Sequence, residues 1–145
     1  MRIVIQRVSE ASVTVDGETI SRIGPGLCIF VGIRNDDNSL KAAALAEKVK
    51  TLRIFADELG KMNLSVADVG GAILVVSQFT LYADCRRGNR PSFSDAAPTA
   101  LAEELYEFFT QKLRDSGLSI ATGKFQSEMQ VALVNHGPVT VILEN

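Results

Sequence analysis

The chain has 145 residues, 46% apolar and 22% charged, which predicts a single globular domain over residues 1–145 whose core needs no disulfide or metal. Its net charge of −2 argues against a protein coated in positive potential for long nucleic acids, although a local cluster at Arg86, Arg87 and Arg90 is enough to grip a short end. Two separate cysteines and the lack of any signal-like or membrane-spanning apolar run make a cytoplasmic protein our expectation.

Strand signals dominate the first residues of the chain. Two β-rich runs, Ile3–Val8 and Ser12–Val15, lead into the dipeptide Asp16-Gly17, which is a strong hairpin signal before Glu18–Ile23. A Gly-Pro-Gly turn then leads to Leu27–Gly32, which is apolar enough to be buried on both faces. We therefore expect a hairpin followed by a buried strand.

A helical pattern follows, after several candidate N-cap residues in the stretch 35–39. The apolar stripe that it predicts consists of Leu40, Ala44, Leu45, Val49 and Leu52. Beyond this helix we expect a short strand at Arg53–Ala56, a polar turn at Asp57–Lys61 and a buried strand at Ile73–Val76. That last strand runs directly into Ser77–Leu81.

The second half of the chain contains a long irregular stretch, Ala83–Ala97, of the length that functional loops have. A second helix is predicted from about Pro98 to Gly117, with a stripe made of Leu101, Leu105, Phe108 and Phe109. The remainder, Leu118–Asn145, is rich in strand signals. The expected fold class is α+β, with antiparallel sheets packed as a barrel-like or sandwich core and two main helices.

A Gly137-Pro138 pair interrupts this last region, between the apolar segments Gln130–Val134 and Val139–Leu143. Proline has no N–H to donate to a strand ladder, and glycine permits positive φ or close backbone approach. We therefore expect a sharp bend at this pair, or something held against its backbone.

Metal and nucleotide chemistry find no support in the residue spacing. One histidine, two distant cysteines and scattered carboxylates give no ligand motif, and no phosphate-binding glycine fingerprint occurs. A phosphatase-type thiolate loop at Cys85 would need an arginine after five intervening residues, whereas Arg90 follows after four. The simpler interpretation is a solvated basic loop.

A catalytic triad is also only weakly indicated. Ser77 or Thr80 with His136 and Asp84 would supply the residue types, but a lone histidine beside a turn is more often a surface residue. The backbone is the stronger candidate, because consecutive N–H groups where a strand ends at Ser77–Leu81 can stabilise an oxyanion. A plain strand end with capping hydroxyls is the alternative.

Seven motifs resemble those of one family. The two longest are Ser77-Gln78-Phe79-Thr80-Leu81 and Asn135-x-Gly137-Pro138-Val139-Thr140. Shorter matches are Gln6-Arg7-Val8, Ala11-Ser12-Val13, Gly60-Lys61-Met62-Asn63, Gly88-x-Arg90-Pro91-Ser92-Phe93, and Thr122-Gly123-x-Phe125 with Met129. They run in order over nearly the whole chain, and together they resemble the D-aminoacyl-tRNA deacylases.

The resemblance implies a homodimeric hydrolase that needs no metal or cofactor. Such an enzyme cleaves the ester between a D-amino acid and the 3′-terminal adenosine of tRNA, acts on glycyl-tRNA as well, and thereby proofreads chirality in translation. The Gly137-Pro138 peptide would be cis, would insert into the partner subunit's pocket, and would present carbonyls that exclude L-amino acids. Arg7 would brace this element, and Met129 would lie beside the pocket.

The reaction itself is assigned to the first long motif. By resemblance, Ser77, Gln78, Phe79 and Thr80 line the adenosine and the reacting carbonyl, and we expect the N–H groups of Phe79 and Thr80 to stabilise the oxyanion. The ribose 2′-hydroxyl is the favoured helper in activating water, with Thr80 as nucleophile the rival. A non-catalytic, dimeric nucleic-acid-binding module is the alternative function.

Two departures from the family pattern are visible in the chain. His136 fills the free position of the second long motif, so the resemblance gives it no catalytic role. The stretch 126–128 replaces a usually smaller segment after Phe125, which leaves the shape of that loop open.

Overall fold

A computed structural model describes all residues from 1 to 145. The elements in chain order are β1 (Arg2–Val15), β2 (Glu18–Ile23), β3 (Gly26–Gly32), α1 (Ser39–Thr51), β4 (Phe55–Ala56), β5 (Met62–Leu64), β6 (Ala72–Ser77), the 3-10 turn η1 (Phe79–Tyr82), α2 (Thr99–Arg114), β7 (Ser119–Thr122) and β8 (Gln130–Glu144). No helix is long and apolar enough to cross a membrane.

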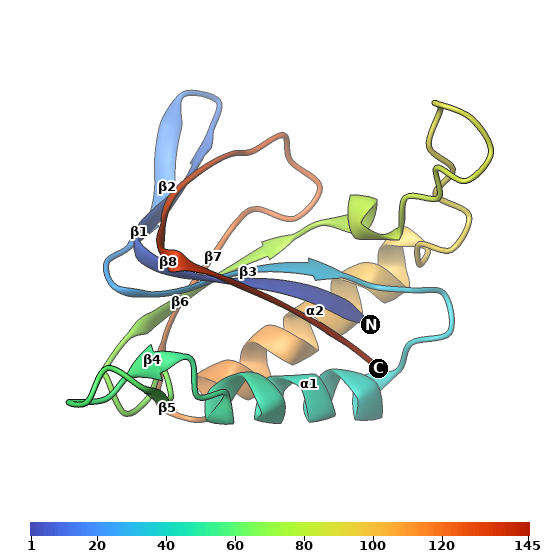
Figure 1. Ribbon diagram of the computed structural model, residues 1–145. Helices are drawn as coiled ribbons and strands as arrows, with labels where there is room; N and C mark the ends of the chain where they lie inside the picture. Colours follow the sequence, from blue (N-terminus) through green and yellow to red (C-terminus); the bar gives the residue numbers. More distant parts are fainter.

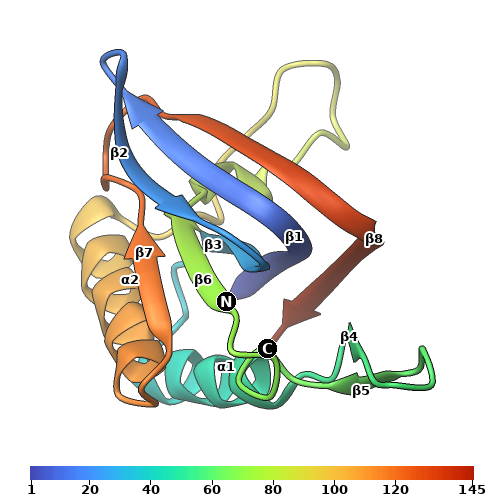
Figure 2. The same ribbon diagram turned by 90° about the vertical axis from the view of Figure 1, so that its left-hand side faces the viewer.

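The two longest strands, β1 and β8, organise the sheet. β8 pairs with β1 along nearly its whole length, from Arg2↔Glu144 to Thr14↔Gln130, while β3 and β2 follow one another along the opposite edge of β1. The order β2-β1-β3-β6-β7 then curls into a barrel-like wall (Figures 1 and 2). The predicted α+β class with a barrel-like core and two main helices is confirmed.

Two strand pairs, β3–β6 and β6–β7, are parallel. Parallel neighbours need long crossover connections, and here α1 lies in the connection before β6 and α2 in the one before β7. Both helices lie against one face of the sheet, and the other face is covered by apolar side chains inside its curl (Figure 1). Strands β3 and β6 are thus buried on both faces, which explains why both read as continuous apolar runs.

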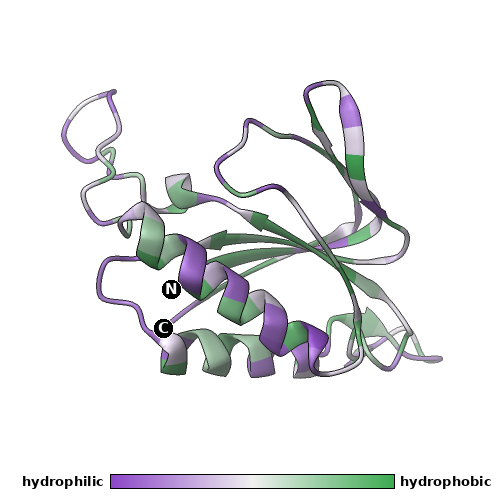
Figure 3. Cartoon of the chain, turned by 180° about the vertical axis from the view of Figure 1, so that it is seen from behind, coloured by the Kyte–Doolittle hydropathy of each residue, from purple (hydrophilic) through white to green (hydrophobic).

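Two groups of apolar side chains fill the fold. The larger lies between the sheet and the helices and includes Ile3, Leu27 and Phe109, and the smaller lies inside the curl of the sheet and includes Val13 and Leu74. Figure 3 shows apolar residues gathered along the central strands, with apolar and hydrophilic residues alternating along the helices. The sheet is thus a wall with a packed interior on each side.

Local sequence signals place several boundaries correctly. Asp16 and Gly17 both have positive φ, of 51° and 80°, as the two-residue turn between β1 and β2 requires. Asn38 caps α1, because its side-chain oxygen accepts a hydrogen bond from the Lys41 N–H at 3.1 Å.

The predicted core stripe of the first helix is partly wrong. Leu40 is 80% exposed and Ala44 is also exposed. The buried residues of α1 are Ala42, Leu45, Ala46 and Val49. The stripe is rotated because α1 packs against α2 and small alanines permit that approach, whereas Leu40 lies in the first turn, beyond the edge of the core.

Other predicted boundaries shift slightly. The strand expected at Arg53–Ala56 shortens to Phe55–Ala56, and Pro98 is the residue before α2 instead of a member of its first turn. The segment expected to continue β6 turns away after Ser77, so that Phe79–Tyr82 form η1.

Strand β8 bends sharply at the Gly-Pro pair (Figure 2). Between the partners Gln6↔Thr140 and Val8↔Asn135, β1 advances two residues while β8 spans five. The extra residues form a bulge whose Gly137-Pro138 peptide is cis and whose Gly137 has φ 140°. The predicted bend is therefore present, and it projects a backbone segment out of the ladder.

Candidate active site

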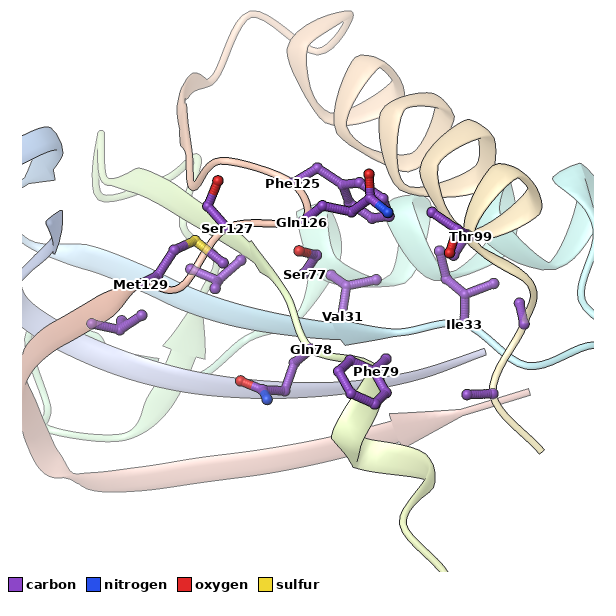
Figure 4. A pocket seen from close by; sticks show the side chains of 15 residues that line it. Val31, Ile33, Ser77, Gln78, Phe79, Thr99, Phe125, Gln126, Ser127 and Met129 are labelled. Carbon is purple, nitrogen blue, oxygen red and sulfur yellow. The ribbon is translucent and has the colours of Figure 1, made fainter. Parts of the chain in front are cut away.

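A cavity of about 600 Å³ opens at the carboxyl end of β6 (Figure 4). Its lining comes from β3, β6, η1, the N-terminal region of α2, and the segment that leads into β8. The lining residues are Val31, Ile33, Val76, Ser77, Gln78, Phe79, Ala96, Ala97, Thr99, Ala102, Phe125, Gln126, Ser127, Met129 and Val131. The volume lies in the range of sites that hold a small molecule or a nucleoside.

The end of β6 is held by contacts from two sides. The Tyr106 hydroxyl of α2 donates to the Val75 carbonyl at 2.9 Å, and the Gly123 N–H donates to the same oxygen at 2.9 Å. Burial raises the pKa of Tyr106 to about 12, so this hydroxyl stays protonated. The strand therefore presents Ser77 and Gln78 to the cavity from a fixed base.

Close packing then sets the direction of η1. The Gln78 N–H donates to the Val31 carbonyl at 2.7 Å, and a Cβ on Gly32 would lie 2.9 Å from the Cβ of Leu81. Only a glycine on β3 lets η1 approach so closely. As a result, the chain turns immediately after the strand and Phe79 faces the cavity mouth (Figure 4).

The first two N–H groups of η1 have no acceptor among the loop carbonyls of the chain. Initial N–H groups of a helical turn have no partner within it, and neither Phe79 nor Thr80 donates its N–H to a loop carbonyl or a side chain. The Gln78 side chain donates to the hydroxyl of Thr80. Two adjacent donors are thus available at the rim of the cavity.

The structure brings together in the cavity the side chains of only some of the residues predicted from the first long motif. Ser77, Gln78 and Phe79 line the cavity, as does Met129 from the opposite wall, but the exposed Thr80 side chain does not. Thr80 adjoins the cavity mouth as the neighbour of Phe79 in η1.

The opposite wall includes residues that the sequence does not mark as functional. Phe125 packs against Tyr106, with ring centroids 5.8 Å apart, and Gln126 adopts a φ of 57° that is uncommon for a residue other than glycine. Ala97 and Thr99 reach the cavity from the start of α2. The motif that contains Phe125 was one signal in the sequence for this wall, and the small residues around Pro98 were the only signal for the part formed by Ala97 and Thr99.

Gly137, Pro138 and Arg7 form a separate arrangement. Arg7 donates from Nε to the His136 carbonyl at 2.9 Å and from Nη1 to the Ile54 carbonyl at 2.6 Å. Gly137 and Pro138 are exposed, and none of the three lines the cavity of its own chain. Arg7 therefore holds the bulge in place, but outside the cavity that Ser77–Phe79 line.

None of the cavity-lining residues is ionisable. Asp84, a member of the weakly indicated triad, instead accepts hydrogen bonds from the Arg86 side chain at 2.9 and 2.7 Å, which hold its pKa at about 2. No group of three His, Cys, Asp or Glu side chains that could hold a metal ion occurs in the chain. The chemical resources at the cavity are backbone N–H groups, hydroxyls and side-chain amides.

Comparisons with known proteins place this chain in a class of enzymes, the hydrolases that act on ester bonds. Residues 4–144 match the model of a family described as D-Tyr-tRNA(Tyr) deacylase, and the chain belongs to that family. It is 57% identical to a D-aminoacyl-tRNA deacylase of Thermotoga petrophila, over 100% of this chain and 97% of that protein. It is 55% identical to one of Bacillus cereus, over 100% and 99%.

Solved structures give the same fold. One described as c-Myc DNA Unwinding Element Binding Protein is 46% identical, covers 100% of this chain and 99% of its own, and superposes with a TM-score of 0.94. Another, described as a probable eukaryotic D-amino acid tRNA deacylase, is 15% identical and covers 98% of this chain and 97% of its own, with a TM-score of 0.87. At this identity it supports the fold alone.

Proposed function

We propose that this chain hydrolyses the ester of D-aminoacyl-tRNA in the cytoplasm and leaves L-aminoacyl-tRNA intact. The observation that carries the proposal is the cavity at the end of β6, which offers two free backbone N–H groups in a chain that belongs to a deacylase family. The terminal adenosine fits a mostly apolar cavity of about 600 Å³, and the ester lies at its mouth.

In the proposed reaction, the N–H groups of Phe79 and Thr80 bind the oxyanion of the tetrahedral intermediate. Loss of one such donor typically costs about 3–4 kcal/mol of transition-state stabilisation. Since no ionisable side chain lines the cavity, the ribose 2′-hydroxyl next to the ester assists the attacking water. Water adds to the carbonyl carbon, and the 3′-oxygen leaves with a proton.

Selection of the D-amino acid is assigned to Gly137-Pro138 of a partner subunit. The bulge is exposed, is braced by Arg7 and lies outside the cavity of its own chain, so it is available to a second copy. A wall of carbonyls where an L side chain would lie rejects that side chain by clash. Glycine has no side chain, so glycyl-tRNA, including that mischarged on tRNA-Ala, passes this filter.

The test is a deacylation assay with D-tyrosyl-, L-tyrosyl- and glycyl-tRNA. We expect hydrolysis of the first and third and survival of the second. Absence of hydrolysis of D-tyrosyl-tRNA overturns the proposal. Thr80→Ala, with the remote Thr51→Ala as control, is compared with a substrate that ends in 2′-deoxyadenosine. Loss of activity with Thr80→Ala and none with the deoxy substrate would favour Thr80 as nucleophile.

DNA binding is the second candidate function. It is favoured by the name of the relative described as a DNA unwinding element binding protein, together with the exposed Arg87 and Arg90 of this chain. A module of this kind predicts salt-sensitive binding of DNA and no ester hydrolysis. The same deacylation assay, run beside a DNA-binding titration at two salt concentrations, separates the two functions.

A further inference from the structure

A pair of exposed aromatic rings stands at the mouth of the cavity. Phe79 is 58% exposed and Phe93 is 37% exposed, and their rings meet edge to face with centroids 5.0 Å apart and an interplanar angle of 64°. Large aromatic rings bury much apolar surface when they have the chance, so two that stay exposed beside a cavity indicate a contact surface.

The position of Phe93 is fixed by the loop that carries it. Asp84 and Ser92 exchange two backbone hydrogen bonds, of 2.8 and 2.9 Å, which close the residues 85–91 into a loop that projects beyond η1 (Figure 1). The Ala96 N–H donates to the Phe93 carbonyl at 3.1 Å. Phe93 is therefore held against Phe79, at the base of the loop.

The same loop supplies positive charge beside the rings. Of its three arginines, Arg86 is occupied by Asp84, with a hydrogen bond of 2.7 Å. Arg87 and Arg90 are exposed and make no ion pair or side-chain hydrogen bond. Two guanidinium groups are thus available to an anionic ligand that reaches the aromatic pair.

We propose that Phe79 and Phe93 form a stacking subsite for the nucleotide that precedes the terminal adenosine, with Arg87 and Arg90 on the flanking phosphates. This inference rests on the proposed function, which places the terminal adenosine in the cavity. The 3′ end of tRNA is single-stranded, so the next base lies unpaired at the mouth. Aromatic rings bind unpaired bases by stacking, and arginines bind the backbone phosphates.

The subsite explains how an enzyme with a net charge of −2 holds RNA. Only the last few nucleotides are gripped, so a small local cluster of charge suffices. Because stacking tolerates every base, this contact adds affinity for a single-stranded end without selecting one tRNA.

The decisive experiment combines a protein variant with a substrate variant. Hydrolysis of D-tyrosyl-tRNA is compared with that of the same molecule lacking the base of the penultimate nucleotide. With the intact substrate, we expect Phe93→Ala to lower kcat/KM about tenfold, mainly through KM, and Phe93→Trp to restore it. With the abasic substrate, we expect the two variants and the wild type to differ less than twofold.

Equal losses with both substrates would overturn the subsite, because they would show that Phe93 supports the fold or a subunit interface and not the missing base. No loss with the intact substrate would overturn it as well. Arg87→Ala and Arg90→Ala should each weaken the binding of both substrates. Each should also reduce the slope of log K for binding against log salt concentration by about one, whereas Arg53→Ala, at an exposed arginine, should not.

The binding of uncharged tRNA separates this inference from the proposed function. If D-tyrosyl-tRNA is not hydrolysed at all, the proposed function fails, yet the affinity of wild type and Phe93→Ala for intact and abasic uncharged tRNA can still be measured. A base-dependent loss of affinity in Phe93→Ala supports the subsite, and its absence overturns it.

Discussion

Removal of the Arg7 side chain should disturb stability and selectivity together. Its guanidinium donates to the Ile54 carbonyl at 2.6 Å and to the His136 carbonyl at 2.9 Å, so it ties the residue before β4 and the bulge of β8 to β1. A hydrogen bond from a charged donor contributes about 1.5–3 kcal/mol, and the contact at His136 is exposed and therefore weaker. We expect Arg7→Ala to lower the free energy of unfolding by about 2 kcal/mol.

Arg7→Lys should recover only part of this loss, because one ammonium group cannot reproduce the fork that reaches two carbonyls. Urea unfolding measures the change, and a matching m-value shows that the folded state keeps its compactness. In parallel, the ratio of D- to L-tyrosyl-tRNA hydrolysis should fall. Arg53→Ala removes an exposed arginine that precedes Ile54 in the sequence; it is the control and should match the wild type.

Two outcomes would refute this reasoning about Arg7. Wild-type stability of Arg7→Ala would show that water replaces both hydrogen bonds without cost. An unchanged D-to-L ratio in a clearly destabilised Arg7→Ala protein would show that the geometry of the bulge does not depend on this arginine.

Three further substitutions test other parts of the structure. Gly137→Ala would place a Cβ 2.9 Å from Nη2 of Arg7, at a residue whose φ is 140°. We expect this change to lower the free energy of unfolding by about 1–3 kcal/mol, measured with urea, and to relax the selectivity for the D-substrate. Wild-type values of both would contradict this. Gly123→Ala would place a Cβ 2.6 Å from the sulfur of Met129. The flexible Met129 side chain should then shift into the cavity, which should raise KM while Tm stays nearly constant. A large fall in Tm would show that the backbone moves instead. Tyr106→Phe should cost about 1 kcal/mol at pH 8 by removing one buried hydrogen bond. Because the pKa of Tyr106 is raised to about 12, the wild type should lose stability between pH 10 and 12 and the phenylalanine variant should lose less; parallel pH curves would argue against this.

Strand patterns and turns could be predicted from the sequence because they depend on neighbours. The alternation in β1, the Asp16-Gly17 turn and the Asn38 cap each follow from a few adjacent residues. The parallel pairing of β3 with β6 and the rotation of the α1 stripe depend instead on packing between distant elements, and Leu40 illustrates that an apolar residue at helical spacing need not face the core.

The candidate site, like the fold, could be predicted from the sequence only in part. Short motifs indicated Ser77, Gln78 and Phe79, which do line one cavity. The wall at Ala97 escaped prediction, because small residues have no distinctive pattern. The resemblance indicated that Arg7 braces the Gly-Pro element, but not that it does so through the His136 carbonyl, because a carbonyl partner leaves no trace in residue identity.

The uncharged lining of the cavity has a consequence for how such a site tolerates mutation. Every residue except proline supplies a backbone N–H, so a reaction that relies on N–H groups at positions 79 and 80 would survive many side-chain replacements that inactivate an enzyme with an acid–base pair. The vulnerable positions would be those that fix the path of the chain, such as Gly32 beneath η1. Selection would then act most strongly on glycines and packing residues, and the changes that abolish activity would fall at positions that take no part in the chemistry.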